Sequence, residues 1–183
     1  MEYSVIMSGF GGQGVLMIGE LLAHSGMKAG LNVTWMPSYG VEMRGGAANC
    51  TVVLSSEKIG APITGMPKAV IAMSEPALKK FGPQLQADCL LMVNSSLIPA
   101  NGNLAKKGVK TLCVPTLELA IASGSEKMSN VAMLGAFVAY TEIISMKQLT
   151  EDVKTFLPPE KSNLVEGINK ALYKGQEFVD SLK

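Results

Sequence analysis

The chain has 183 residues, of which 48% are hydrophobic and 17% are charged, and its formal net charge is +1. This length is sufficient for a hydrophobic core, and the high apolar content excludes intrinsic disorder. A balanced charge without a basic block argues against electrostatic binding of nucleic acid or of an anionic membrane surface.

The N-terminal segment predicts a strand, a glycine turn, a helix and a second strand. Residues 3–8 form a short apolar run that ends at the glycine cluster of residues 9–14. From Val15 onward, apolar residues recur at helical spacing until Gly26 and Gly30 interrupt the pattern. Residues 32–36 then predict a strand that Pro37 closes. This order is a βαβ unit, which opens an α/β fold.

The rest of the chain predicts further strands and an increasing share of helix. Strands are expected at residues 50–54, 69–73, 89–93 and 109–114, and helices at 75–81 and 117–122. Residues 131–144 are almost uncharged and predict a helix buried in the core or under a partner. After Pro158 and Pro159, an amphipathic helix is expected with one apolar side, formed by Leu164, Ile168, Leu172, Val179 and Leu182. We therefore expect one α/β domain over residues 1–183, with a helical C-terminal third.

The cysteines and the N-terminus indicate a cellular compartment. Cys50, Cys89 and Cys113 lie far apart and form no C-x-x-C pair, so we expect no zinc or iron–sulfur site and three buried, reduced thiols. The N-terminus lacks the basic region of a signal peptide. The longest charge-free helical stretch, residues 131–141, is shorter than the roughly 18 apolar residues that span a bilayer. We expect a soluble, cytoplasmic protein.

The glycine turn has the spacing of a phosphate-binding loop. Gly9, Gly11 and Gly14 satisfy G-x-G-x-x-G between a predicted strand and a predicted helix. A dinucleotide site also carries an acidic residue about 20 positions later, which holds the ribose. Residues 34–38 contain no acid, which counts against NAD. Two alternatives remain open: a site for an anion or the edge of a cofactor, and a tight turn without a ligand.

A second motif surrounds Arg44, the only arginine of the chain. Between Lys28 and Glu57, the only charged residues are Glu42 and Arg44. The planar guanidinium grips a carboxylate or a phosphate with two parallel hydrogen bonds, which lysine cannot do. Arg44 therefore either contacts a ligand or partner, or pairs with Glu42 and fastens the loop.

Other polar residues give weaker signals. His24 lies in the middle of a predicted helix and is expected to be a surface or packing residue. Residues 94–96, Asn-Ser-Ser, follow a strand and either form a turn or line a cleft. Asn130 is first of all a candidate N-cap. No catalytic triad and no set of metal ligands can be assembled, so we expect no catalytic residue in this chain.

The two motifs together resemble those of a known family. The glycine turn reads GFGGQG over residues 9–14, and the arginine motif reads YGVEMRGGAANC over residues 39–50. Both resemble the gamma subunit of 2-oxoacid:ferredoxin oxidoreductases, and the pattern fits the 2-oxoglutarate type best. Residues 71–74, 93–96, 130–135, 169–171 and Gly175 also fit, so the resemblance runs almost from end to end. Val41 departs from the family pattern, in which proline is common at this position. The departure bears on the rigidity of the loop more than on its role.

The resemblance implies a Rossmann-like three-layer domain that acts as one component of a complex. Such complexes decarboxylate a 2-oxoacid on thiamine diphosphate, pass electrons through iron–sulfur clusters to ferredoxin and form an acyl-coenzyme A. Alpha, beta and delta subunits are the implied partners, and they hold the clusters and thiamine diphosphate. The gamma domain binds no cofactor tightly, is inactive alone, and lies beside the active site with a part in coenzyme A access. The implied cofactor-contacting residues are Gly9, Gly11, Gly12, Gln13, Gly14, Tyr39, Gly40, Glu42, Arg44, Gly45, Gly46 and Asn130.

Three alternatives stay open at this point. The first is a subunit of an indolepyruvate or branched-chain 2-oxoacid enzyme of the same superfamily. The second is a free-standing nucleotide-binding protein that uses the glycine turn alone. The third is a scaffold subunit that makes no contact with the active site.

Overall fold

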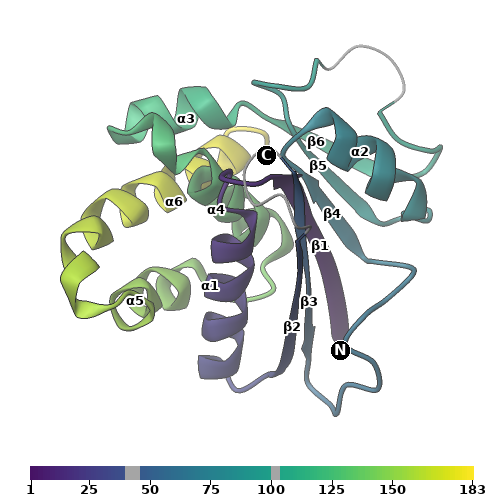
Figure 1. The fold of residues 1–183 in the computed structure, drawn as a ribbon, viewed down its shortest axis with the longest axis horizontal. Helices are drawn as coiled ribbons and strands as arrows, with labels where there is room; N and C mark the ends of the chain where they lie inside the picture. Colours follow the sequence, from purple (N-terminus) through teal and green to yellow (C-terminus); the bar gives the residue numbers. More distant parts are fainter. Residues whose placement is uncertain (40–45, 100–103) are drawn as a thin grey trace.

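A mixed six-stranded sheet forms the centre of the computed structural model, which describes residues 1–39, 46–99 and 104–183 (Figure 1). Its strands run in the order β2-β3-β1-β4-β5-β6. They are β1 (Glu2–Phe10), β2 (Asn32–Tyr39), β3 (Ala47–Ser55), β4 (Ala69–Ala72), β5 (Leu90–Asn94) and β6 (Lys110–Val114). All six predicted strands are therefore confirmed, with small shifts at their ends.

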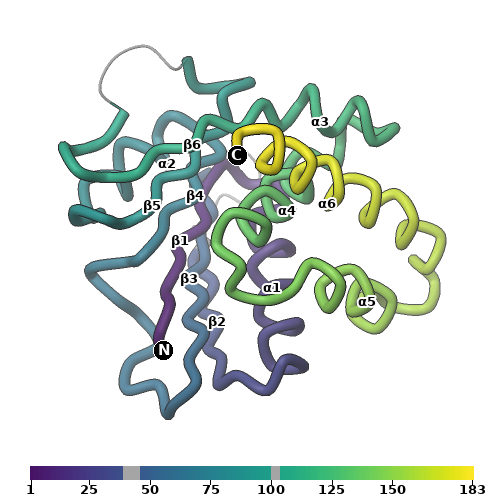
Figure 2. Tube along the Cα trace, turned by 180° about the vertical axis from the view of Figure 1, so that it is seen from behind, coloured from purple at the N-terminus to yellow at the C-terminus, as the bar shows by residue number. Residues whose placement is uncertain are grey.

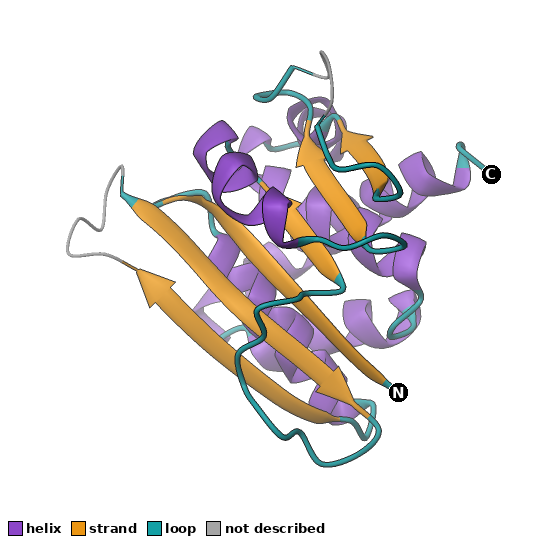
Figure 3. Cartoon of the chain, turned by 90° about the vertical axis from the view of Figure 1, so that its right-hand side faces the viewer, coloured by secondary structure: helices purple, strands orange, loops and turns teal. Residues whose placement is uncertain are grey.

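Helices cover both faces of this sheet, but unequally. The helices are α1 (Val15–Lys28), α2 (Glu75–Phe81), α3 (Thr116–Ser123), α4 (Ser129–Thr141), α5 (Met146–Phe156) and α6 (Val165–Asp180), with short 3-10 turns η1 (Gly82–Gln84), η2 (Glu126–Met128) and η3 (Pro159–Leu164). Helix α2 lies on one face, and the other five helices gather on the opposite face (Figures 2 and 3). This arrangement confirms the three-layer α/β prediction and the helical C-terminal third.

The position of β3 distinguishes this sheet from a dinucleotide-binding fold. Strands β1, β4, β5 and β6 are parallel, whereas β3 runs antiparallel to both β1 and β2. The predicted βαβ unit therefore exists as β1-α1-β2, but β3 separates its two strands. As a result, the end of β2 does not lie beside the glycine turn, where a dinucleotide fold places its ribose-binding acid.

The prediction that Pro37 closes the second strand is wrong. Pro37 lies inside β2 and pairs with Cys50 of β3. Because β2 is an edge strand, one side of its backbone has no neighbouring strand to bond, and an edge position tolerates a residue without an N–H group.

The largest part of the core lies between the sheet and the five-helix face. Residues 130–138 of α4 are all buried, which confirms the prediction of a buried helix. Helix α6 packs against α4 and buries Ile168, Leu172 and Val179. The predicted apolar side is wrong at its two ends, because Leu164 and Leu182 lie outside the helix and are 38% and 58% exposed. Of the three thiols expected to be buried, Cys50 and Cys89 are buried, but Cys113 is only half-buried.

Candidate functional site

A small cavity opens where the four parallel strands end. Its volume is about 230 Å³, and we call it the strand-end cavity. Its wall is formed by the segment after β1, the residue after β4, the end of β5 with the turn that follows it, the start of α3, η2 and the start of α4. The lining residues are Gly12, Gln13, Met73, Asn94, Ser96, Leu97, Thr116, Leu117, Glu126, Lys127, Ser129 and Asn130. The carboxyl ends of parallel strands are the usual ligand site of an open α/β sheet.

The glycine turn closes largely on itself. The Phe10 N–H donates to Gln13 Oε1 at 2.7 Å, and the Gln13 N–H donates to the Phe10 carbonyl at 3.1 Å. Gln13 Nε2 then donates to the Met73 carbonyl at 3.2 Å, which ties the turn to the end of β4. A Cβ at Gly9 would meet Gln13 Oε1, so this glycine leaves room for the side chain that closes the turn. Several donors of the turn are thus used internally and do not face a ligand.

Gly12 and Gly14 have backbone conformations that favour glycine. Their φ angles are +98° and +70°, in the left-handed region. A Cβ at Gly14 would also meet Asn130 Nδ2, whereas a Cβ at Gly12 would meet nothing within 4 Å. Gly14 is therefore required both by the turn and by its close contact with α4.

Asn130 does not cap its helix, so its assignment as an N-cap is wrong. Helix α4 begins one residue earlier, after Met128, and has no side-chain cap. Instead, Asn130 Nδ2 donates to the Gly14 carbonyl at 3.1 Å across the cavity wall. This bond joins the glycine turn to α4, which no local sequence pattern could reveal because the two residues are 116 positions apart.

The segment that follows β5 forms a second polar wall. Asn94 Oδ1 accepts hydrogen bonds from Thr116 Oγ1 at 2.7 Å and from the Ser96 N–H at 3.1 Å. Ser96 Oγ donates to Glu118 Oε2 at 2.6 Å, and this bond lowers the pKa of the Glu118 carboxyl group. Of the two roles left open for residues 94–96, the structure shows both, since the segment is a turn and also lines the cavity.

Most of the arginine motif cannot be placed against this cavity. The calls on Gly40, Glu42, Arg44 and Gly45 lie outside the described residues. The backbone of Tyr39 pairs with Ala48, but its side chain is not described either. Gly46 is described, and its carbonyl accepts from the Gly11 N–H at 2.7 Å. This hydrogen bond joins the glycine turn to the end of the arginine motif.

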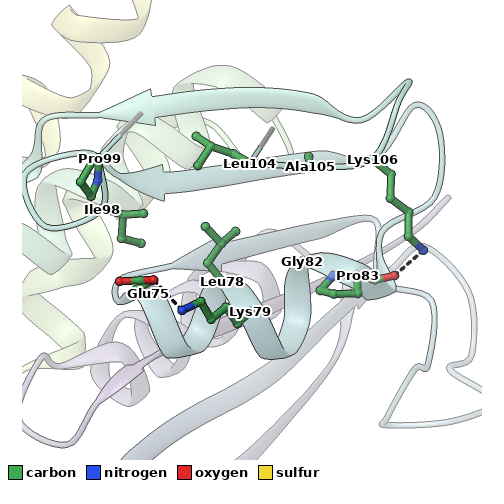
Figure 4. Close-up of a pocket in the computed structure, with 10 residues that line it drawn as sticks. All are labelled: Glu75, Leu78, Lys79, Gly82, Pro83, Ile98, Pro99, Leu104, Ala105 and Lys106. Carbon is green, nitrogen blue, oxygen red and sulfur yellow. Dashed lines mark hydrogen bonds and ion pairs between the residues drawn. The ribbon is translucent and has the colours of Figure 1, made fainter. Parts of the chain in front are cut away.

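A larger cavity, of about 770 Å³, lies between α2 and the segment after β5 (Figure 4). Its walls are mainly aliphatic, with Leu78, Ile98 and Leu104 facing one another. Its charged groups are engaged at the edge, because Glu75 pairs with Lys79 at 2.6 Å and Lys106 donates to the Pro83 carbonyl at 2.6 Å. Two of its lining segments are joined by residues 100–103, which the structure does not describe, so we place no site there.

His24 is a packing residue, as predicted. Its Nε2 lies 3.2 Å from Thr155 Oγ1, and its ring lies against Phe156. Thr155 Oγ1 also accepts from Lys28, which forms an ion pair with the buried Asp152 at 3.1 Å. These contacts fasten α1 to α5, away from the strand-end cavity.

Comparisons with known proteins agree with this geometry. A family model described as pyruvate ferredoxin/flavodoxin oxidoreductase matches residues 4–178. The chain belongs to this family. Its full-length relatives include the 2-oxoglutarate synthase subunit KorC of Methanothermobacter marburgensis, which is 30% identical over 186 residues and matches across 98% of this chain and 97% of the relative.

The family also contains longer chains. The ketoisovalerate oxidoreductase subunit VorA of Methanothermobacter thermautotrophicus is 35% identical over 138 residues, which are 75% of this chain. The matched part is 28% of VorA, so this chain spans less than a third of that relative.

A solved structure shows the same fold at full length. The gamma subunit of a keto/oxoacid ferredoxin oxidoreductase from Geobacter sulfurreducens superposes with a TM-score of 0.82 and is 28% identical, with 98% of this chain and 99% of that chain covered. The chain therefore shares its fold with an oxidoreductase gamma subunit.

Two kinds of feature are absent from the described residues. Within residues 1–39, 46–99 and 104–183, no three His, Cys, Asp or Glu side chains come together as metal ligands. Over the same ranges, none of the helices combines the length and the apolar character needed to cross a bilayer.

Proposed function

We propose that the chain is the gamma subunit of a 2-oxoacid:ferredoxin oxidoreductase complex. In this reaction a 2-oxoacid is oxidatively decarboxylated to an acyl-coenzyme A, and the electrons pass to ferredoxin. The observation that carries the proposal is the match with a 2-oxoglutarate synthase subunit over 97% of that subunit's length. A match over nearly the whole of that subunit supports the same assignment for this chain.

The catalytic groups are proposed to belong to the other subunits. Iron–sulfur clusters are held mainly by cysteine thiolates, and the described cysteines do not gather into such a set. Cys50 is unsuited for another reason, because burial raises the pKa of its thiol to about 12. We therefore assign no chemical step to a cluster or to thiamine diphosphate on this chain.

The role proposed for this chain is to shape one wall of the shared active site. Coenzyme A supplies the thiol that accepts the acyl group, and its access requires a fixed wall. The bond from Asn130 to Gly14 and the bond from Gln13 to Met73 hold three segments of the cavity in place. We propose that this edge of the sheet, together with Arg44, faces the active site of the complex.

The proposed substrate is 2-oxoglutarate, with ketoisovalerate as the second candidate. The full-length relative KorC, a 2-oxoglutarate synthase subunit, supports 2-oxoglutarate. Ketoisovalerate is supported by the higher identity to VorA, 35% over 138 residues.

Reconstitution tests both parts of the proposal. The chain is co-expressed with candidate thiamine-binding and iron–sulfur subunits from the same organism, and reduction of ferredoxin is measured with 2-oxoglutarate, pyruvate, ketoisovalerate and indolepyruvate in the presence of coenzyme A. We expect coenzyme A-dependent ferredoxin reduction that is fastest with 2-oxoglutarate and absent without this chain. A stable complex that is equally active without this chain would contradict the proposal.

A further inference from the structure

Strand β2 forms one edge of the sheet, and alternate residues of it direct their backbone groups away from the sheet (Figure 3). Directly after β3, the Ser56 N–H donates to the Met1 carbonyl at 2.9 Å, so even-numbered residues of β3 direct their backbone groups to β1. Odd-numbered residues of β3 therefore bond to β2, where they pair with even-numbered residues. The odd-numbered residues Val33, Trp35 and Pro37 consequently face outward, and no described strand pairs with their two N–H groups and three carbonyl groups.

This edge lacks the charges that commonly protect an edge strand. Soluble proteins keep such strands short or charged, which prevents pairing with another chain. The opposite edge follows this rule, because β6 has 5 residues and begins with the exposed Lys110. Strand β2 has 8 residues and no charged side chain. Pro37 removes one outward donor, but the N–H groups of Val33 and Trp35 remain, so β2 can still accept an added strand.

A groove lies beside this edge. A cavity of about 370 Å³ is bounded by β2, α1 and the end of α5, and we call it the edge groove. Its apolar wall contains Met27, Val33, Trp35 and Phe156, and Met27 is 58% exposed. The side chains of Val33 and Trp35 point toward α1. Since side chains alternate along a strand, every second side chain of a strand added to β2 would face the edge groove.

The polar groups of the edge groove accept hydrogen bonds. Among the described residues that line it, Glu20 alone carries a full charge, and it is exposed. His24 Nε2 lies 3.2 Å from Thr155 Oγ1, which donates its own hydrogen to the Asp152 carbonyl. Nε2 therefore carries a hydrogen, and Nδ1 is the acceptor of the neutral ring. Lys28 does not supply a cation to the groove, because it forms an ion pair with Asp152 at 3.1 Å.

We propose that the edge of β2 binds an extended segment of a partner chain, which adds a strand to the sheet and places an arginine or lysine side chain in the edge groove. The aliphatic part of that side chain packs on Met27 and Trp35, and its cationic end faces the Glu20 carboxylate. Main-chain hydrogen bonds supply affinity in this mode of binding, and the groove supplies specificity. That the partner is another subunit of the oxidoreductase rests on the proposed function.

A second copy of this chain does not fit the same surface through its own β2. Two copies could pair their open edges, but β2 contains no basic residue to place opposite Glu20. Charge complementarity therefore favours a segment of a different chain.

Hydrogen exchange with single-residue resolution tests the pairing, in the isolated chain and in the reconstituted complex. In the isolated chain, the N–H groups of Thr34 and Met36, which face β3, are expected to exchange slowly, and those of Val33 and Trp35 quickly. In the complex, exchange at Val33 and Trp35 should slow by about tenfold or more, because a strand then covers them. Unchanged exchange at both residues in a complex that contains this chain would overturn the proposal.

Val33→Pro blocks the open edge without removing a hydrogen bond to β3. Val33→Ala is the matched control, because it also removes the valine side chain but keeps the outward N–H. The affinity of Val33→Pro for the other subunits is expected to be about tenfold lower than that of Val33→Ala, since one main-chain hydrogen bond is lost and the proline ring obstructs the added strand. Equal affinities of the two variants would contradict the proposal. If Val33→Pro does not fold, the exchange pattern of the native chain decides.

Glu20→Arg tests the basic side chain. Glu160→Arg makes the same change of charge at an exposed position in η3. We expect Glu20→Arg to weaken association with the other subunits about fivefold, because two cations then meet in the groove, and Glu160→Arg to leave it unchanged. Equal affinities of these two variants would show that no basic side chain occupies the edge groove.

The remaining outcomes separate the possible partners. The isolated chain is expected to sediment as a monomer, and a dimer that Val33→Pro dissociates would overturn the proposal in favour of self-pairing. A complex that reduces ferredoxin without protection of Val33 and Trp35 would refute this inference and leave the proposed function intact. A complex that protects both residues but reduces no ferredoxin with any of the four 2-oxoacids would do the reverse.

Discussion

Glycine is required in two regions of this molecule for different physical reasons. In the glycine turn, a Cβ at Gly14 would meet the side chain of Asn130 and would strain a left-handed backbone. Where α4 and α6 cross, a Cβ at Gly135 would meet the Leu172 carbonyl, and one at Gly175 would meet the Ala132 carbonyl and the Ala136 N–H. A side chain can rotate away, whereas two packed helices must separate. The glycine crossing, Gly135 with Gly175, therefore sets stability, and the glycine turn sets the shape of the cavity.

The largest expected effect comes from the glycine crossing. Gly135→Ala places a methyl group against helix backbone, and overpacking of this kind costs about 3 kcal/mol of the free energy of unfolding, more than the improved helix propensity returns. Urea denaturation measures the loss. The matched control is Gly167→Ala in α6, where the nearest atom to a Cβ is Met128 Cε at 3.9 Å, and this variant is expected to gain about 0.5–1 kcal/mol. Equal stabilities of the two alanine variants would show that the helices do not pack backbone against backbone.

Gly14→Ala is expected to have a smaller effect on stability and a larger one on the cavity. The left-handed conformation and the displacement of Asn130 together cost about 2 kcal/mol. Gly30→Ala is the control, because Gly30 also has a positive φ but no atom within 4 Å of a Cβ, so that only the backbone strain of about 1 kcal/mol remains. Thermal unfolding measures both variants. If Gly14→Ala costs no more than Gly30→Ala, Asn130 does not constrain the turn.

The pH dependence of stability at alkaline pH distinguishes the glycine turn from the glycine crossing, because a buried thiol lies near the turn. Burial raises the pKa of the Cys50 thiol, which lies against Val15 at the start of α1, from 9.0 to about 12. The stability that this neutral thiol contributes is complete below pH 9 and is lost between pH 9 and about 12, because the unfolded chain ionises first. The free energy of unfolding should fall by at most about 1.4 kcal/mol per pH unit from this group.

The measurement is a series of urea midpoints between pH 8 and 10. Over this range Cys50→Ala should flatten the pH dependence, whereas Cys113→Ala, at a half-buried thiol, should keep it. The residues that touch at the glycine crossing carry no titratable side chain, so Gly135→Ala should follow the pH dependence of the native chain. A Cys50→Ala variant with an unchanged slope would contradict the assignment.

The smallest effect is expected on the outer side of α6. Glu166 and Lys170 form an exposed ion pair at 2.7 Å, and the hydrogen bond from Lys170 lowers the pKa of the Glu166 carboxyl group. Exposed pairs of this kind are screened by solvent and salt. Glu166→Gln should therefore leave the urea midpoint unchanged at high salt, although it lies on the same helix as Gly175. A marked loss of stability would show that the exposed side of α6 matters as much as its glycine.

Parts of the candidate site could be predicted from the sequence, and parts could not. The spacing of Gly9, Gly11 and Gly14 placed a tight turn between a strand and a helix, and the structure has it there. The same spacing could not show that Gln13 would occupy the turn's own donors. Residues 94–96 follow a buried strand, which was a signal for a cleft, but the pairing of Asn94 with Thr116 joins residues 22 positions apart. A role for Arg44 remains a prediction.

The sequence by itself determined the elements of this protein, and the tertiary structure decided how they meet. Hydrophobic periodicity and glycine positions are local properties, so the strands, the buried α4 and the amphipathic α6 followed from them. Strand β3 lies between β1 and β2 and runs antiparallel to both, and no local hydrophobic pattern indicates this position or this direction. The bond of Asn130 to Gly14 likewise depends on how α4 packs against the start of α1. Such contacts between distant residues exist only once the chain has packed, and they give the cavity its shape.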